Sequence, residues 1–172
     1  DGNIARLGLL TEEQSRRAEE VIQQATDDGI ETVRVVFADQ HGILRGKTVV
    51  IDGLRSAFQS GVTVTSTLLL KDTSHRTVFP VWGNDIGFGI GTLTGAGDIM
   101  LVPDPDTFHV LPWSPHSSLI LCDLYYKDGK PGPFSTRGIL RDAIAHLDAN
   151  GKRLICGLEV EFYVFHVDQP KL

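Results

Sequence analysis

Two glutamates, Glu159 and Glu161, stand two positions apart in the apolar stretch 154–165. Alternate side chains of an extended strand point to opposite faces, so these two carboxylates share one face, about 6.5–7 Å apart along the chain. Like charges at this spacing repel each other unless water or a cation lies between them. Mg²⁺ and Mn²⁺ prefer carboxylate oxygen as a ligand. The spacing therefore indicates either a divalent metal site or a solvated strand face.

The residues around the two acids favour the metal site. Apolar side chains lie on both faces of the predicted strand 154–165, as expected of an inner strand whose carboxylates face an enclosed site. Other candidates are weaker, because the six histidines form no HExxH or His-x-His pair. The glycines between residues 83 and 97 lack the spacing of a dinucleotide-binding or phosphate-binding loop. His41 is of interest only because it lies beside Asp39 in a predicted turn.

Composition excludes several classes of function. The 172 residues carry 22 acidic and 16 basic side chains and a net charge of −6, which does not favour binding to nucleic acid. No apolar run approaches the roughly 20 residues of a membrane-spanning helix. Two cysteines, Cys122 and Cys156, do not suggest a disulfide framework or a zinc knuckle. We expect a soluble, cytoplasmic protein, and interpret the chain from Asp1 to Leu172 as a fragment of a longer one.

The elements that must position these residues follow from capping and periodicity. Thr11 and Gln14 predict a capping box at the start of the first long helix. Glycines and prolines interrupt the apolar pattern wherever a turn or loop is expected. In chain order we predict a helix ended by Asp28-Gly29, a hairpin over 33–51 with its turn at 39–42, a short helix closed by Gly61, a strand over 62–70, a long loop over 71–97, and strands over 98–102 and 118–126.

The last third of the chain predicts a β-α-β unit. Ser135 can cap a helix with one apolar stripe, and Gly151 ends this helix before the strand 154–165. A proline-punctuated link precedes the unit and favours a domain boundary there. The predicted parts are a helical segment over residues 1–29, a first domain over 30–112 and the start of a second domain over 113–172.

Four segments in this order resemble the glutamine synthetase family. They are Val36-Phe37-Ala38-Asp39 with a D-x-x-G-x-x-R-G-K pattern ending at Lys47, Gly97 to Asp104, Leu111-Pro112-Trp113 leading to Cys122-Asp123-Leu124, and the G-x-E-x-E-F strand from Gly157 to Phe162. Their common order makes the resemblance far more specific than any one segment alone. It covers nearly the whole chain after the first helix.

The resemblance implies an α+β fold, with an N-terminal β-grasp domain followed by the first β-α-β of a glutamine-synthetase catalytic domain. It implies a ligase that phosphorylates the γ-carboxylate of glutamate with ATP and couples it to ammonia or a primary amine. Family enzymes use two or more Mg²⁺ or Mn²⁺ ions per site. They assemble as homo-oligomeric rings, usually dodecamers, with each active site between two subunits.

Carried over by residue, Glu159 and Glu161 look like metal ligands, and Asp39 looks like the carboxylate that the β-grasp domain lends to a neighbour's amine pocket. The chemistry agrees, since cations neutralise phosphate charge and an acid can hold an ammonium and accept its proton. The resemblance identifies no nucleotide-binding residue here. The family's F-D-G-S-S segment is absent where this chain has residues 70–76, and only Arg137 remains of its D-P-R. These departures favour γ-glutamyl amides of amines larger than ammonia.

Two alternatives have the same fold. One is a non-catalytic binding or assembly module, in which the β-grasp region serves only subunit contacts and Glu159 and Glu161 are solvated. The other is a pseudoenzyme. Under every interpretation residues 1–172 alone are expected to be inactive, because two carboxylates cannot complete a divalent site that needs about six oxygen ligands.

Overall fold

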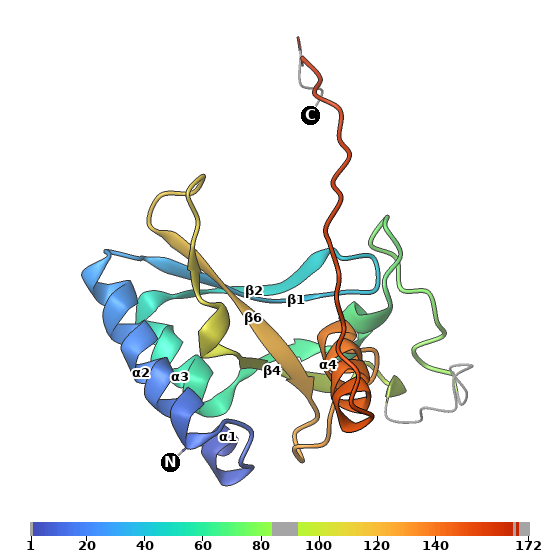
Figure 1. The fold of residues 1–172 in the computed structure, drawn as a ribbon, viewed down its shortest axis with the longest axis horizontal. Coiled ribbons are helices and arrows are strands. Elements are labelled where there is room, and N and C mark those ends of the chain that lie inside the picture. The colour runs from blue at the N-terminus through green and yellow to red at the C-terminus, as the bar shows by residue number, and fades with distance from the viewer. Residues whose placement is uncertain (1, 84–92, 167, 169–172) are drawn as a thin grey trace.

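The computed structural model describes residues 2–83, 93–166 and 168, and shows a mixed α+β fold built on one six-stranded sheet (Figure 1). Part of the predicted loop 71–97, residues 84–92, lies outside the described residues. The described elements, with 3₁₀ helices labelled η, are α1 (Asn3–Arg6), α2 (Glu12–Asp27), β1 (Thr32–Ala38), β2 (Leu44–Val50), α3 (Ile51–Ser60), β3 (Val62–Thr65), η1 (Ser66–Leu70), β4 (Asp98–Pro103), η3 (Pro105–Thr107), β5 (His109–Val110), β6 (Ser117–Tyr125) and α4 (Thr136–Ala149).

The long strand β6 lies in the middle of the sheet, whose order is β2-β1-β6-β4-β3. Its first half pairs in parallel with β1, and its second half pairs antiparallel with β4. The short strand β5 also pairs with β6. The predicted domain boundary between residues 112 and 113 therefore falls between strands of one sheet, and the boundary itself stays a prediction.

Local signals place the first long helix and the hairpin as predicted. Thr11 Oγ1 accepts a hydrogen bond from the Gln14 amide at 3.1 Å, and Gln14 Oε1 accepts one from the Thr11 amide at 3.0 Å, so the capping box is confirmed. The helix α2 ends before Gly29, whose φ of +66° glycine adopts without steric cost. The hairpin of β1 and β2 is also confirmed, with Ala38 paired to Leu44 at its turn.

The main core lies between one face of the sheet and the helices α2 and α3, which run side by side (Figure 1). It contains the fully buried side chains Val21, Val33, Val35, Leu54, Ile99, Leu101 and Ile120. Alternate residues of β4 point to the opposite face, where Met100 and Val102 pack against Ile4 of α1. Both faces of the central sheet are thus covered at this end by the chain's own helices.

Two strand predictions are wrong. The predicted strand 62–70 is a strand only to Thr65 and continues as η1. The second strand of the predicted β-α-β, residues 154–165, pairs with no described strand and projects from the body of the molecule (Figure 1). A strand needs a neighbour to take its backbone hydrogen bonds, and no described strand lies alongside residues 154–165.

The helix α4 forms where predicted but packs loosely. Ser135 caps it by accepting a hydrogen bond from the Gly138 amide at 3.2 Å. No residue of this helix is buried, and Ile139 and Leu140 of its apolar stripe are 61% and 53% exposed. None of the described helices is long and apolar enough to cross a membrane.

Candidate functional site

The turn between β1 and β2 buries the predicted site residue Asp39. Its Oδ1 accepts hydrogen bonds from the backbone amides of His41 at 2.8 Å and Ile43 at 2.9 Å, while its Oδ2 accepts one from Arg45 Nε at 2.6 Å. The pairing of Phe37 with Arg45 across the hairpin brings the guanidinium to this end. Asp39 therefore closes the turn with a carboxylate whose side chain has no exposed surface.

The electrostatics of this turn keep Asp39 ionised. Burial raises the pKa of the carboxyl, but the hydrogen bonds from Arg45 and from the amides of His41 and Ile43 outweigh burial and hold the pKa below its usual value of 3.8. A carboxylate has about four acceptor directions, and three are occupied here. One direction at Oδ2 is left for a further donor.

Arg45 links Asp39 to a second turn, at residues 72–76. Its Nη1 lies 2.6 Å from His75 Nδ1, and its Nη2 donates to the Asp72 carbonyl at 3.4 Å. The carboxylate of Asp72 in turn accepts from the amides of Ser74 and Arg76 at 2.9 and 2.8 Å. The sequence spacing of Asp39 and Arg45 across a turn could have indicated their contact, but no sequence signal pointed to His75.

A second charged cluster joins α4 to the sheet. Arg137 bonds Asp104 through Nη2 and lies 3.3 Å from Asp123 Oδ1 through Nη1. Arg141 Nη2 contacts both carboxylate oxygens of Asp123, at 2.9 and 2.8 Å. Residues of two of the resembling segments, Asp104 and Asp123, thus meet the arginine that remains of D-P-R near the ends of β4 and β6 and the start of α4. Asp104, Asp123 and Arg137 all lie in the family-like segments of the sequence, but no sequence signal predicted these pairs.

The first turn of α4 also reaches the hairpin. Thr136 Oγ1 donates a hydrogen bond to the carbonyl of Ala38 at 2.8 Å, next to Asp39 in the chain. The charged cluster and the hairpin turn are therefore held by the same helix end. This contact makes the position of α4 depend on the geometry of the hairpin.

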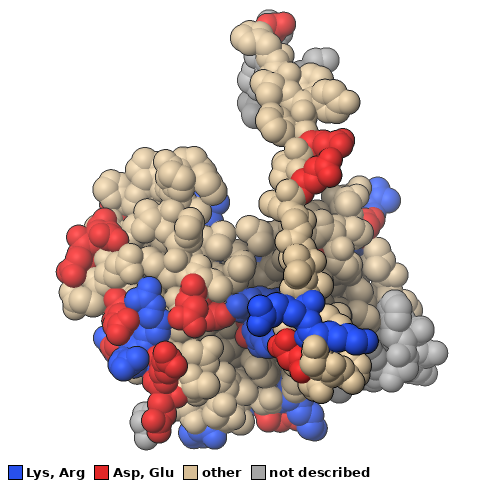
Figure 2. All heavy atoms as spheres, in the orientation of Figure 1, with Lys and Arg blue, Asp and Glu red and all other residues tan. Residues whose placement is uncertain are grey.

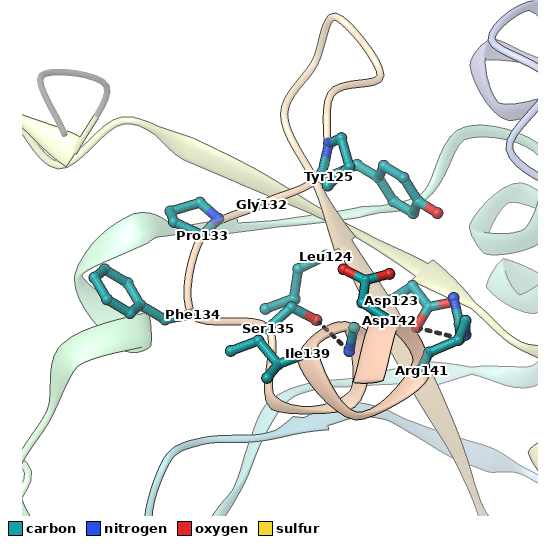
Figure 3. Close-up of a pocket in the computed structure, with 12 residues that line it drawn as sticks. Asp123, Leu124, Tyr125, Gly132, Pro133, Phe134, Ser135, Ile139, Arg141 and Asp142 are labelled. Atoms are coloured by element: carbon teal, nitrogen blue, oxygen red, sulfur yellow. Dashed lines mark hydrogen bonds and ion pairs between the residues drawn. The ribbon is translucent and has the colours of Figure 1, made fainter. Parts of the chain in front are cut away.

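Two cavities flank the start of α4. One, of about 300 Å³, is lined by charged side chains on one side, including Asp123, Arg141 and Asp142, and by Phe134 and Ile139 on the other (Figure 3). The second, of about 310 Å³, is mostly apolar and is lined by residues of β1, β6 and α4. Neither cavity is lined by Asp39, Glu159 or Glu161, so the structure does not bring the three predicted site residues together in one pocket.

Glu159 and Glu161 lie on the projecting segment, and both are exposed. Acidic side chains of this segment stand away from the body of the molecule (Figure 2). The expected enclosed acid pair is therefore wrong for this structure, because the strand that would enclose it has no partner. No group of three or more His, Cys, Asp or Glu within the described ranges could hold a metal ion. The two carboxylates are hard oxygen donors suited to Mg²⁺ or Mn²⁺ but supply only part of a ligand shell; their role as ligands stays a prediction.

Comparison with curated proteins shows which family contains these segments. The chain is 36% identical over 164 residues to the γ-glutamylanilide synthase of Acinetobacter sp. The aligned region covers 94% of this chain and 33% of that protein. It is 28% identical over 158 residues to the glutamate–isopropylamine ligase of Pseudomonas sp, covering 91% of this chain and 33% of that protein. It is 29% identical over 153 residues to the glutamine synthetase of Methanosarcina mazei, covering 87% and 30%. The chain belongs to the glutamine synthetase family.

The chain spans about a third of the length of these relatives and corresponds to the N-terminal portion of the glutamine synthetase family. A solved GmaS/ADP complex superposes with a TM-score of 0.55 at 22% identity, over 76% of this chain and 26% of that one. A crystal structure of a novel glutamine synthase homologue gives a TM-score of 0.56 at 22% identity, over 70% and 27%. These two likenesses show the fold alone. No protein-family model matches the chain.

Proposed function

We propose that this chain is the N-terminal part of an ATP-dependent ligase that couples the γ-carboxylate of glutamate to an amine through a γ-glutamyl phosphate. The observation that carries the proposal is the 36% identity to a γ-glutamylanilide synthase over 94% of the chain. An alignment of that length includes residues 36–162, which contain all four resembling segments. The remaining two thirds of a relative's length leave room for the nucleotide site.

The amine is proposed to be a primary amine larger than ammonia. Two of the relatives are named for anilide and isopropylamine products or substrates, and this chain lacks the F-D-G-S-S segment of glutamine synthetases proper. In its place, residues 72–76 form a turn held by the Asp72 carboxylate and tied to Arg45. This turn is our candidate for the element that shapes the amine side of the site.

In the complete enzyme, residues 30–112 form a β-grasp domain and β6, α4 and residues 154–165 form the first β-α-β of the catalytic domain. Residues 158–162 alternate apolar and acidic side chains, so pairing of the segment 154–165 with further strands would bury Leu158, Val160 and Phe162 and turn Glu159 and Glu161 to one face. Divalent cations, when bound there, neutralise the charge of the transferred phosphate. The two glutamates would hold these cations.

Asp39 is proposed to serve the amine side of a neighbouring subunit's site, within a homo-oligomeric ring. The Arg45 contact keeps its carboxylate ionised, and the free acceptor direction at Oδ2 suits an N–H of the amine. Because the side chain has no exposed surface in this structure, the amine reaches Asp39 only after a local movement of the turn. The role of the residue would be to orient the amine and to take up its proton.

The experiment that tests this function is a substrate panel on the full-length enzyme. Glutamate-dependent and amine-dependent ADP release are measured with Mg²⁺ or Mn²⁺, and kcat/KM is compared for ammonia and for alkyl and aromatic primary amines. We expect kcat/KM for at least one primary amine to exceed kcat/KM for ammonia. A preference for ammonia over every amine would make the protein a glutamine synthetase proper.

The second candidate is a non-catalytic module or pseudoenzyme of the same fold. The exposure of Glu159 and Glu161 in this structure is the observation that favours it. Its signature in the same panel is the absence of glutamate-dependent ADP release with any amine and either metal.

A further inference from the structure

We infer that His75, acting through Arg45, is a positioning residue for Asp39, so that the turn at residues 72–76 controls how tightly the enzyme binds its amine. The inference rests on the proposed function for its link to the amine, and on the geometry of three side chains for the link between the turns. These side chains come from three places in the chain: the end of β1, the start of β2 and the turn before residue 77.

The direction of the Arg45–His75 hydrogen bond follows from chemistry. A guanidinium has only donors, so Nδ1 of His75 must be the acceptor at 2.6 Å, and the ring proton lies on Nε2. Arg45 is buried, and its planar fork donates to Asp39 through Nε and to His75 through Nη1 at the same time. A change in the position of His75 would therefore move the Arg45 guanidinium and, with it, the hydrogen bond to Asp39.

Removing the acceptor on His75 frees one side of this fork. Arg45 would then keep only the weak contact of Nη2 with the Asp72 carbonyl, at 3.4 Å, to hold it against the 72–76 turn. A guanidinium with fewer restraints no longer holds Oδ2 of Asp39 in one orientation. Asp39 itself stays anchored through Oδ1 by the amides of His41 and Ile43, so the hairpin turn survives the change.

The backbone at His75 decides which substitutions isolate this contact. Its φ of 64° lies in the left-handed region, which glycine and asparagine tolerate better than other residues. His75→Gly removes the acceptor without backbone strain, whereas His75→Asn keeps the backbone and offers an amide oxygen as a replacement acceptor. Glycine also adds backbone freedom, and His75 is exposed, so neither variant removes core packing.

A matched control exists on the other side of the molecule. His116 is also exposed, has a φ of 57° and makes one Nδ1 hydrogen bond to a backbone carbonyl, that of Gly29, at 3.0 Å. His116→Gly therefore repeats the loss of a histidine contact at positive φ. It does so away from Asp39 and Arg45.

The experiment measures the KM for the amine, the KM for glutamate and glutamate-dependent ADP release in the full-length enzyme and the three variants. We expect His75→Gly to raise the KM for the amine about tenfold, the ratio that one lost hydrogen bond to a charged group gives, while the glutamate KM and ADP release change by less than about twofold. His75→Asn and His116→Gly should stay within about twofold of wild type in every parameter.

An unchanged amine KM in His75→Gly, or an equal loss in His75→Asn, would overturn the inference. A failure of the proposed function is distinguishable, because the wild-type enzyme would then release no ADP in response to glutamate. The link between the turns has its own readout in a crystal structure of His75→Gly. The Arg45 guanidinium should turn away from the 72–76 turn in that structure and change its angle to Asp39 Oδ2, and an unmoved guanidinium would refute the link between the turns.

Discussion

Two regions of the molecule carry similar apolar patterns but differ in how far their apolar side chains are buried. One is the sheet with α2 and α3, and the other is the C-terminal stretch from α4 onward. The first buries Val33, Ile99 and Leu101 completely. The second leaves Leu158 91% exposed, and no residue of α4 is buried. An apolar pattern shows that a surface is suited to burial, but it does not identify the partner. In the first region the partner is within the described chain, and in the second it is not.

The charged contacts of the two regions differ in the same way. Asp39 and Arg45 form a pair whose side chains are 0% and 6% exposed, inside the hairpin of the packed region. Arg141, which holds α4 to Asp123, is 52% exposed, so solvent screens that pair. Buried pairs contribute strongly to local geometry because no water can replace either partner. We therefore expect the α4 attachment to rearrange more easily than the hairpin turn.

The largest effect is expected from Glu159 and Glu161. It concerns the full-length enzyme, in which further parts of the chain would supply the remaining metal ligands. Glu161→Ala or Glu159→Ala should remove a metal ligand and lower turnover by orders of magnitude, without a change in thermal stability. Steady-state kinetics and Mn²⁺ titration measure this. The exposed Glu31, which lies before β1, offers Glu31→Ala as a control that should retain activity. If Glu161→Ala kept wild-type turnover and Mn²⁺ affinity, the metal-ligand role would be wrong, and the two glutamates would be solvated surface residues.

Truncating a core side chain should lower the free energy of unfolding far more in the packed sheet region than in the C-terminal stretch. In residues 1–172, Leu101→Ala should lower the free energy of unfolding by about 2–5 kcal/mol, because it leaves a cavity in a filled core. Phe162→Ala, at a side chain that is 76% exposed, should change it by less than about 0.5 kcal/mol. Urea unfolding followed by circular dichroism measures both. Similar losses in the two variants would mean that the C-terminal segment packs against the body in solution.

Acid sensitivity is expected from the hairpin turn. The pKa of Asp39 is held below 3.8 in the folded state, so the stability that its ionised form contributes is present above about pH 4 and is lost as the pH falls through the folded-state pKa. Asp39→Asn should cost about 1–3 kcal/mol at neutral pH, since the hydrogen bond to a charged partner is lost. Its stability should then fall less steeply than that of the wild type below pH 4.

Unfolding curves collected from about pH 2.5 to about pH 7, roughly the interval over which carboxylates titrate, check this expectation. Parallel acid limbs for wild type and Asp39→Asn would contradict the assignment of a lowered pKa to this residue.

The smallest expected effects concern the two helix caps. Thr11→Ala should lower global stability by about 1 kcal/mol, because it removes the side-chain oxygen that accepts from the Gln14 amide at the start of a helix packed on the core. Ser135→Ala removes an equivalent cap from α4, but this helix buries no residue. We expect faster amide exchange at Gly138 and little change in global unfolding. An equal global loss in both variants would show that α4 unfolds together with the core.

Much of the first region could be predicted from the sequence because its signals are local. The Thr11 capping box, the turn after Asp39, and the strands at 98–103 and 117–125 all depend on residues within a few positions of one another. The contact of Arg45 with His75 joins residues 30 positions apart, and that of Arg137 with Asp104 joins residues 33 apart. No local preference specifies such pairs, because they depend on which loops the folded sheet brings together.

By itself, the sequence determined the three longest helices, the hairpin, the acidic pair at Glu159 and Glu161, and the ordered segments that resemble the glutamine synthetase family. Only the tertiary structure decided that β6 lies between β1 and β4 and that the stretch 154–165 is left without a partner. Capping and alternation act over a few residues of backbone, whereas strand pairing depends on which edges remain free once the whole sheet has formed.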